Sequence, residues 1–185
     1  MTQFLYAATA TVDGRIAGAD GDMSWLLPHM GPDPILDRLM PQIQALLVGR
    51  TTYDGDDPHA GDTEKEGAFE GSWSGPQVLL THRPPATPPP GITVTTDLDV
   101  ALSTCRAAAP DGIVSILGAD VARQCLEAGA VDLVMVTTVP VMLGQGTPLL
   151  QGSTGQIDLD VVDESPRTRL FRVRRDGEPR DRSDS

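Results

Sequence analysis

Short apolar runs, each ended by a turn signal or a group of polar residues, restrict this chain to a few architectures. They lie at 4–12, 45–48, 77–81, 113–117 and 133–139 and are rich in small, aliphatic and β-branched residues. Runs of this length with little polar alternation are typical of strands buried on both faces of a parallel sheet. The run Ile92-Thr93-Val94-Thr95-Thr96 predicts one more strand.

Helical patterns separate these runs. Apolar residues fall on one face of 97–109 and 120–128, and Pro32-Asp33-Pro34 opens an earlier helix. The last two strands, about 157–163 and 168–174, alternate apolar and polar residues, which predicts a C-terminal antiparallel hairpin. We therefore expect an α/β domain with a mixed central sheet and ligand sites at the carboxyl ends of strands.

Three segments are expected to lack regular structure. Residues 15–27 predict an irregular loop. The stretch 54–76 holds many acidic residues and glycines against the single Lys65, which predicts a mobile surface insertion. Residues 176–185 are charged and contain no apolar side chain, which predicts a disordered tail. The folded domain is therefore expected to comprise residues 1–175.

The charge balance narrows the possible partners. The chain has 14 basic and 26 acidic residues and a formal charge of −12, which predicts no binding to nucleic acid or to an anionic membrane. The two cysteines and three histidines have no metal-ligand spacing. With no apolar run of about 18 residues and no secretory pattern at Met1-Thr2-Gln3-Phe4, we expect a reduced cytoplasmic protein without metal.

An anionic ligand would have to be held locally, and one candidate site follows the strand 113–117. Gly118 and Ala119 are small, and a helix begins at once. Unpaired N–H groups at that helix start suit a pyrophosphate. The alternative is a tight turn in which Asp120 only caps the helix.

Two other strand ends carry cations. Arg50 with Thr51 and Thr52 suits a phosphate monoester such as the 2′-phosphate of NADPH, although a solvated strand end is the alternative. Thr81-His82-Arg83 ends another strand. If the three strand ends are adjacent, they account for an anionic cofactor on an acidic protein.

Three further features have two interpretations each. Asp13 is either catalytic or bonded to its own turn. Trp25 either covers a flat ring or anchors packing. The loop Leu143-Gly144-Gln145-Gly146-Thr147 either contacts substrate or forms a flexible turn.

Five motifs, spread over about residues 3–173, carry a resemblance to a known family. They are Thr11-Val12-Asp13-Gly14-Arg15-Ile16-Ala17-Gly18, Leu47-Val48-Gly49-Arg50-Thr51-Thr52-Tyr53, Val78-Leu79-Leu80-Thr81-His82-Arg83-Pro84, Leu117-Gly118-Ala119-Asp120-Val121-Ala122-Arg123-Gln124 and Val139-Pro140-Val141-Met142-Leu143-Gly144-Gln145-Gly146-Thr147. In this order they resemble the dihydrofolate reductase-like superfamily. The chain is most similar to stand-alone proteins that resemble the C-terminal reductase domain of the bifunctional riboflavin-biosynthesis deaminase–reductase.

The resemblance implies a three-layer α/β/α fold with a mostly parallel sheet of about eight strands. It also implies NADPH as hydride donor and a homodimer. The implied activity is reduction of a small heterocyclic or imine/carbonyl substrate, similar to that of 5-amino-6-(5-phosphoribosylamino)uracil reductase or dihydrofolate reductase. A non-catalytic nucleotide- or drug-binding dimer on the same fold, and a structural dimer that binds no nucleotide, are the alternatives.

By the same resemblance, each site residue receives an expected role. The 2′-phosphate side is assigned to Gly49, Arg50, Thr51 and Thr52. The adenine and ribose are assigned to Thr81, His82 and Arg83. The pyrophosphate is assigned to Leu117, Gly118, Ala119, Asp120 and Val121. The nicotinamide is assigned to Thr9, Ala17 and Gly18. The substrate is assigned to Asp13, Trp25, Tyr53, Val139, Leu143 and Gly144. Asp13, or a water held near Thr11, is the expected proton donor.

Several departures from its relatives occur, including Leu117 where many relatives have a glycine and Gln145 where an acidic residue or glycine is frequent. No P-C-x-x-C motif occurs, so we expect no deaminase half in this sequence. The first strand reads Tyr6-Ala7-Ala8 where riboflavin-pathway reductases usually carry a lysine. Dihydrofolate reductases place a carboxylate on the helix after the Trp loop, whereas Asp33 lies further along from Trp25 here.

Overall fold

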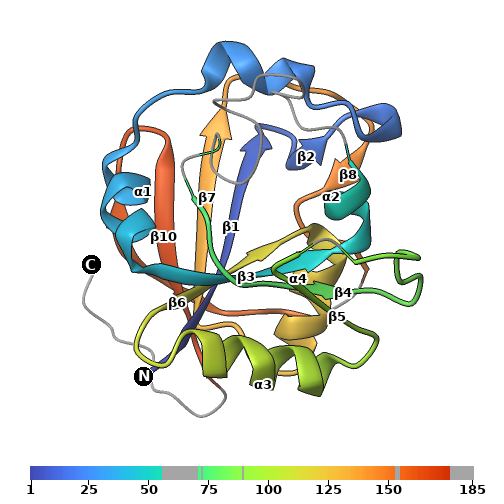
Figure 1. The fold of residues 1–185 in the computed structure, drawn as a ribbon. Coiled ribbons are helices and arrows are strands. Elements are labelled where there is room, and N and C mark those ends of the chain that lie inside the picture. Colours follow the sequence, from blue (N-terminus) through green and yellow to red (C-terminus); the bar gives the residue numbers. More distant parts are fainter. Residues whose placement is uncertain (56–70, 72, 89, 153–154, 176–185) are drawn as a thin grey trace.

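The computed structural model describes residues 1–55, 71, 73–88, 90–152 and 155–175. Within these residues the chain forms an eight-stranded sheet with the order β5-β4-β3-β6-β1-β7-β10-β9 (Figure 1). Its strands are β1 (Gln3–Thr11), β3 (Ile43–Gly49), β4 (Gln77–Leu80), β5 (Ile92–Thr95), β6 (Ile113–Leu117), β7 (Leu133–Val139), β9 (Leu159–Glu164) and β10 (Thr168–Val173). The predicted mixed sheet of about eight strands is confirmed.

Parallel pairing joins the strands from β5 across to β7, whereas β10 runs antiparallel to both β7 and β9. Burial explains the apolar runs, because every residue of β3 except Gln44 is buried. The predicted C-terminal hairpin is present as β9 and β10. At the edge of the sheet, β9 leaves Val161 and Val162 more than half exposed.

Helices on both faces make the domain three layers thick (Figure 1). They are α1 (Pro34–Leu39), α2 (Arg50–Asp54), α3 (Leu98–Ala108) and α4 (Ala119–Glu127). α3 and α4 contribute residues such as Leu102 and Val121 to one buried apolar cluster. α1 contributes Ile35 and Leu39 to a second cluster on the other face. Aromatic residues are 4% of the chain, so aliphatic side chains fill most of both clusters.

Asp33 fixes the start of α1. Its side chain accepts hydrogen bonds from the backbone N–H groups of Ile35 (2.9 Å) and Leu36 (3.1 Å), and Pro34 occupies the first helical position. The helix ends early in a 3₁₀ turn, Met40–Gln42, whose proline cannot donate the next helical hydrogen bond. The predicted helix start is therefore confirmed.

Residues 15–27 are more regular than predicted. They include the strand β2 (Arg15–Ala17) and most of two 3₁₀ turns, Ala19–Gly21 and Ser24–His29. β2 pairs with β8 (Thr147–Pro148), which is distant in sequence. Strands of two or three residues leave no periodic pattern, so the prediction of an irregular loop was wrong here. The helix α2 was missed for the same reason, because it has only five residues. We expected these residues to be the polar end of a strand.

Two predicted segments cannot be compared in full. Of the insertion 54–76, residues 56–70 and 72 lie outside the described residues, and so does the tail 176–185. Trp73 in the described part packs against the cluster beside α1 and donates from Nε1 to the carbonyl of Ile43 (3.0 Å). Across the described ranges, no helix has the length and apolar character needed to cross a bilayer.

Candidate functional site

Three of the predicted strand ends lie side by side. β6, β3 and β4 are parallel neighbours, with Val48 opposite Leu117 and Gly49 opposite Leu80. Carboxyl ends of neighbouring parallel strands share one edge of a sheet. A Cβ atom on Gly118 would lie 3.8 Å from the backbone nitrogen of Gly49, so the turns that follow β3 and β6 are in contact.

Glycine keeps the space in front of α4 open. Gly118 has φ +113°, which disfavours other residues, and a Cβ there would lie 2.7 Å from Oγ1 of Thr52. A Cβ on Gly49 would lie 2.8 Å from a methyl group of Val121. Gly49, Arg50, Thr52 and Gly118 are called the cofactor cradle below.

The first turn of α4 has no side-chain cap within the described residues. Asp120, which we considered as a cap, instead accepts hydrogen bonds from Arg123 (2.9 Å) and Gln124 (2.8 Å). The side chains of Ala119 and Val121 are buried, so these residues can offer a ligand their backbone groups alone. The helix start therefore keeps the N–H groups that an anion would bind.

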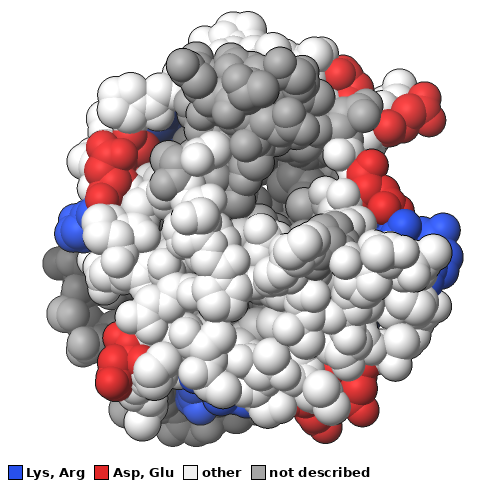
Figure 2. Space-filling model, viewed as in Figure 1, with Lys and Arg blue, Asp and Glu red and all other residues white. Residues whose placement is uncertain are grey.

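Arg50 lies between this turn and the end of β4. Its Nη1 donates to the carbonyl oxygen of Arg83 (2.6 Å), and its Nε donates to Asp54 (2.5 Å). The guanidinium also lies 5.6 Å from the centre of the Tyr53 ring. Figure 2 shows that the blue atoms on the right of the molecule border directly on acidic red atoms. The positive charge of Arg50 is therefore confined to this part of the surface and is partly neutralised by Asp54.

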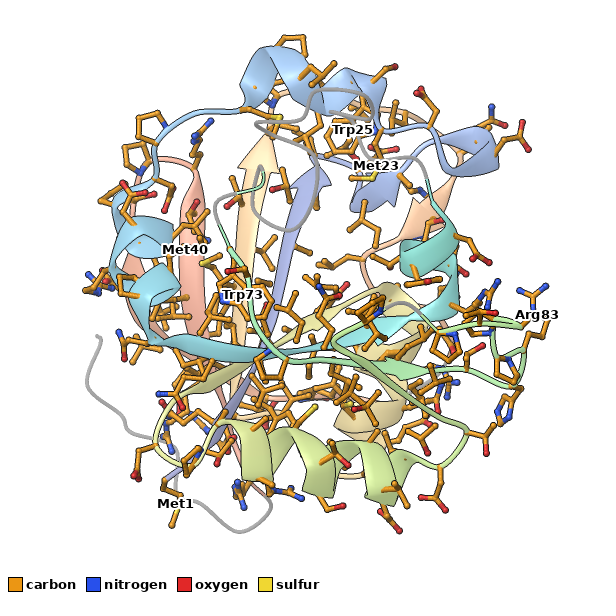
Figure 3. The ribbon with its side chains drawn as sticks, viewed as in Figure 1. Met1, Met23, Trp25, Met40, Trp73 and Arg83 are labelled. Atoms are coloured by element: carbon orange, nitrogen blue, oxygen red, sulfur yellow. The ribbon has the colours of Figure 1, made fainter. Side chains whose placement is uncertain are left out.

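The end of β4 offers a ligand fewer free polar groups than the sequence predicted. Thr81 is 5% exposed, and its hydroxyl oxygen accepts a hydrogen bond from the backbone nitrogen of Arg83 (2.9 Å). Figure 3 shows the Arg83 side chain extending outward at the edge of the molecule. The structure brings the backbone of Arg83, but not its guanidinium, to Arg50. His82 is exposed.

Asp13 fastens the end of β1 to the loop after β7. Oδ1 accepts from the Thr11 hydroxyl (2.6 Å) and from the amide of Leu143 (3.2 Å), and Oδ2 accepts from the amide of Gly144 (2.7 Å). The hydrogen bonds from Thr11 and Gly144 lower the pKa of Asp13 to about 2. A carboxyl group that is ionised throughout the neutral range is a poor proton donor, so this geometry supports a positioning role instead.

The loop after β7 also packs on β2. A Cβ on Gly146 would overlap the backbone of Ala17 and Gly18, so two of the three expected nicotinamide contacts lie against this loop. Val139 is 1% exposed, so its side chain offers a ligand little surface, although it borders the cavity described below. Leu143 is half-buried.

Trp25 lies in the 3₁₀ turn Ser24–His29. Figure 3 shows it beside Met23, above and to the right of the β1 arrowhead. Its Nε1 donates to the carbonyl of Asp22 (3.2 Å). Arg167 holds the same segment by donating to the carbonyls of His29 (2.7 Å) and Gly31 (3.1 Å). The sequence offered no signal for Arg167, because its partners are backbone carbonyls more than a hundred residues away.

A polar network between the start of α1 and strands β10 and β7 was also missed. Thr168 Oγ1 donates to Oδ2 of Asp33 (2.6 Å), and the hydroxyls of Thr168 and Thr137 are 2.7 Å apart. We had assigned Asp33 to the helix start alone. Asp33 contacts Thr168 because β10 pairs antiparallel with β7. No local sequence pattern predicts a contact between residues so far apart.

A cavity of about 470 Å³ borders some of these residues. Val139, an expected substrate contact, and Arg167 line it together with Val136, Thr138 and Arg169. The cavity therefore lies at the end of β7, beside the segment that Arg167 holds.

Comparison with known proteins identifies the family. The model of the RibD C-terminal domain matches residues 4–178. The chain belongs to the RibD C-terminal domain family. This confirms the family resemblance expected from the five motifs. Curated proteins gave no significant match to this chain.

Solved structures share the fold of this RibD C-terminal domain. A putative riboflavin biosynthesis protein from Shewanella sp. PV-4 matches with TM-score 0.72 and 20% identity over 94% of this chain and 99% of the other. A Thermotoga maritima diaminohydroxyphosphoribosylaminopyrimidine deaminase/5-amino-6-(5-phosphoribosylamino)uracil reductase matches with TM-score 0.60 and 17% identity over 94% of this chain and 56% of its own. Dihydrofolate reductase from Enterococcus faecalis, complexed with NADP(H), matches with TM-score 0.57 and 17% identity over 92% and 94%. The expected dihydrofolate reductase-like fold is confirmed.

Proposed function

We propose that this chain is an NADPH-dependent reductase of a small heterocyclic or imine/carbonyl substrate. The observation that carries the proposal is the cofactor cradle, because it joins small residues, a cation and uncapped amides at neighbouring strand ends. Family membership supports it. So do the solved relatives, one described as a reductase and one as an NADP(H) complex.

The residues present fit a phosphorylated dinucleotide. The pyrophosphate would meet the amides of Gly118 and the first turn of α4, where a Cβ on Gly118 would fill the space. Arg50 would bind the 2′-phosphate, since a guanidinium binds phosphate oxygens in a bidentate manner. Asp54 opposes this contact through its ion pair with Arg50. NADPH, when bound, supplies the hydride.

At the other end, the chain orients the reacting rings. Thr9, Ala17 and Gly18 would contact the nicotinamide, and Trp25 would cover the substrate and exclude water. Asp13 accepts hydrogen bonds from the amides of Leu143 and Gly144, so it holds this loop beside Ala17 and Gly18. Because Asp13 is ionised at neutral pH, the proton for the product comes from a water molecule near Thr11 rather than from this carboxyl.

Calorimetric titration with NADPH and NADH tests the cofactor. The protein is expected to bind NADPH more tightly, and Arg50→Ala is expected to narrow that preference about tenfold, the equivalent of about 1.4 kcal/mol. Arg38→Ala is the matched control, because Arg38 pairs with Asp163 on β9, far from the cradle in strand order. An unchanged preference in Arg50→Ala would remove Arg50 from the phosphate site.

The ionised state of Asp13 favours one alternative, a nucleotide-binding domain without turnover. A panel of pterins, pyrimidines and carbonyl compounds separates the two functions. Oxidation of NADPH with any member supports the reductase. Tight NADPH binding with no oxidation across the panel supports the binding domain.

We also propose that the protein acts as a cytoplasmic homodimer, as the family resemblance implies. The edge strand β9 supports association, because Val161 and Val162 are 58% and 55% exposed there. Analytical ultracentrifugation tests the dimer. A monomer at micromolar concentration would contradict it.

A further inference from the structure

One side of the sheet is covered by helices along only part of its width. On that side α3 and α4 pack against β3, β4, β5 and β6. The sheet continues through β7, β10 and β9, where Val134, Phe171 and Val161 lie opposite one another in register and therefore share a side. Val136 shares it too, because alternate residues of a strand face the same way. Val134 belongs to the buried cluster of α3 and α4, so this row begins in the core and ends in solvent.

The outer part of this side is apolar and partly exposed. Val161 is 58% exposed, and Phe171 and Val136 are half-buried. Leu159 lies opposite Val173 in register and is 39% exposed. These five residues are called the open face below. A continuous apolar surface of this kind marks a place where another molecule binds.

The cavity of about 470 Å³ forms a groove at one end of the open face. Val136 and Thr138 of β7 line it between Val12, which follows β1, and Pro166, which lies between β9 and β10. The sheet order brings these walls together, since β7 lies between β1 and β10. Valine and proline make up most of the lining, so the groove suits an apolar side chain.

An exposed methionine lies at the rim of this groove. The backbone N–H of Val12 donates to the carbonyl of Val141 (2.9 Å), so Met142 directly follows a residue that contacts the Val12 wall. Met142 is 73% exposed. A methionine side chain is flexible and adapts to irregular apolar spaces. The surface therefore presents a groove and, beside it, a side chain that suits such a groove.

A second copy of this chain suits the open face better than the next part of the same chain does. Residues 176–185 follow shortly after β10, but their sequence contains no apolar side chain. A two-fold axis brings the same patch of two copies together, so a groove and its neighbouring methionine are both satisfied twice.

The charges beside the open face are self-complementary as well. Arg169 and Glu164 lie 3.5 Å apart and are 64% and 65% exposed. Arg169 lies opposite Val136 in register and also lines the groove. Because both signs of charge occur on one patch, a two-fold axis can bring Arg169 of each copy to Glu164 of the other.

We propose that a second copy of this chain docks on the open face, with Met142 of each copy seated in the groove of the other. The inference rests on the proposed homodimer and identifies its surface. Docking there also reaches the candidate site, because Leu143 and Gly144 directly follow Met142 and donate to Asp13. A seated Met142 restrains this loop, so the dimer binds NADPH more tightly than the monomer does.

Sedimentation velocity over a range of protein concentrations tests the surface. We expect Met142→Asp to weaken dimerisation at least about thirtyfold, because a carboxylate replaces an anchor that docking buries. Val161→Asp is expected to weaken it as well, whereas Met142→Leu is expected to retain it within about threefold. Val100→Asp is the matched control, because Val100 is 49% exposed on α3, which covers other strands. Thermal melting of each variant shows that it is folded.

The surface and the homodimer fail in different ways. A dimer that survives both Met142→Asp and Val161→Asp, such as one joined by backbone pairing of two β9 edges, would overturn the inference and leave the proposed homodimer intact. A wild-type protein that stays monomeric at micromolar concentration would overturn both, but not the proposed reductase.

Titration with NADPH tests the link to the candidate site. Saturating NADPH is expected to tighten dimerisation of the wild type about fivefold, because coupling between binding and association is reciprocal. An unchanged dimerisation constant with NADPH bound would overturn the link to the loop. A protein that fails to bind NADPH contradicts the proposed reductase, whereas the effects of Met142→Asp and Val161→Asp on dimerisation still decide the docking surface.

Discussion

The cofactor cradle and the polar network of Asp33, Thr137 and Thr168 are built from different kinds of contact. In the cofactor cradle, each residue lies at or just after the end of a buried strand, and the proposed binding groups are backbone amides and Arg50. In the polar network, the hydrogen-bonded partners are 31 and 135 residues apart, and one buried carboxylate accepts from Thr168. The cradle depends on charge and open space, and the network on the direction of hydrogen bonds. Substitutions can therefore impair one and spare the other.

Gly118→Ala is expected to have the largest effect on the cradle. The new methyl group would lie 2.7 Å from Oγ1 of Thr52 at φ +113°, so both the turn and the anion-binding space must change. We expect a loss of NADPH affinity of about a hundredfold or more, the equivalent of at least about 2.8 kcal/mol, measured by calorimetry.

Gly129→Ala is the matched control for that variant. Gly129 also has a positive φ, +64°, and lies just beyond the other end of α4, but its Cβ would meet no atom within 4 Å. Gly129→Ala would therefore strain the backbone at a positive φ without filling any space that a ligand could use. Equal losses of NADPH affinity in both variants would mean that strain, rather than a filled cradle, explains the effect.

Asp33→Ala is expected to be the most destabilising change in the polar network, because it removes a helix cap and leaves Thr168 without its acceptor. The loss should be about 1–3 kcal/mol in urea unfolding at neutral pH. The folded pKa of Asp33 is lowered, so its contribution is present above the unfolded pKa of about 3.9 and disappears as the pH falls through the folded pKa. The difference between wild type and Asp33→Ala should therefore shrink toward pH 3, and a constant difference would contradict this account.

Asp54→Asn is expected to strengthen the cradle moderately. The substitution removes the carboxylate that now pairs with Arg50, so the guanidinium becomes more available to a phosphate. NADPH affinity should rise about threefold while NADH affinity stays the same, which corresponds to less than about 1 kcal/mol for an exposed pair. Asp163→Asn, which releases Arg38 instead, controls for the change in net charge.

Asp13 is expected to give the smallest pH effect. Its pKa of about 2 lies below the unfolded value, so its contribution is present above about pH 3.9 and is lost only as the pH falls toward 2. NADPH binding should therefore show no titration of Asp13 between about pH 5 and 8. A titration in that interval that Asp13→Asn abolishes would return Asp13 to the role of proton donor.

The same contrast explains what could be predicted from the sequence. Buried strands such as β3 have an apolar composition that reflects burial on both faces, and Gly118 and Arg50 follow such strands directly. Asp33 announced the start of α1 because capping is local. These features depend on interactions within a few residues, and the predicted strands and the helix start at Asp33 are confirmed.

Long-range contacts account for the features that were missed. The pairing of β2 with β8, the grip of Arg167 on the carbonyls near His29, and the contact of Thr168 with Asp33 each join segments more than a hundred residues apart. The sequence also could not reveal that Thr81 is occupied within its own turn or that Val139 is buried. Such outcomes follow from tertiary packing.

An NMR titration of the ¹⁵N-labelled protein with NADPH tests the central claim most directly. The account predicts that the amides of Gly49, Gly118 and Ala119 shift together with one dissociation constant, with Arg50 Nε among the responding groups. Shifts confined to residues around the cavity at Val136 and Arg169, with Gly118 and Arg50 unchanged, would contradict it.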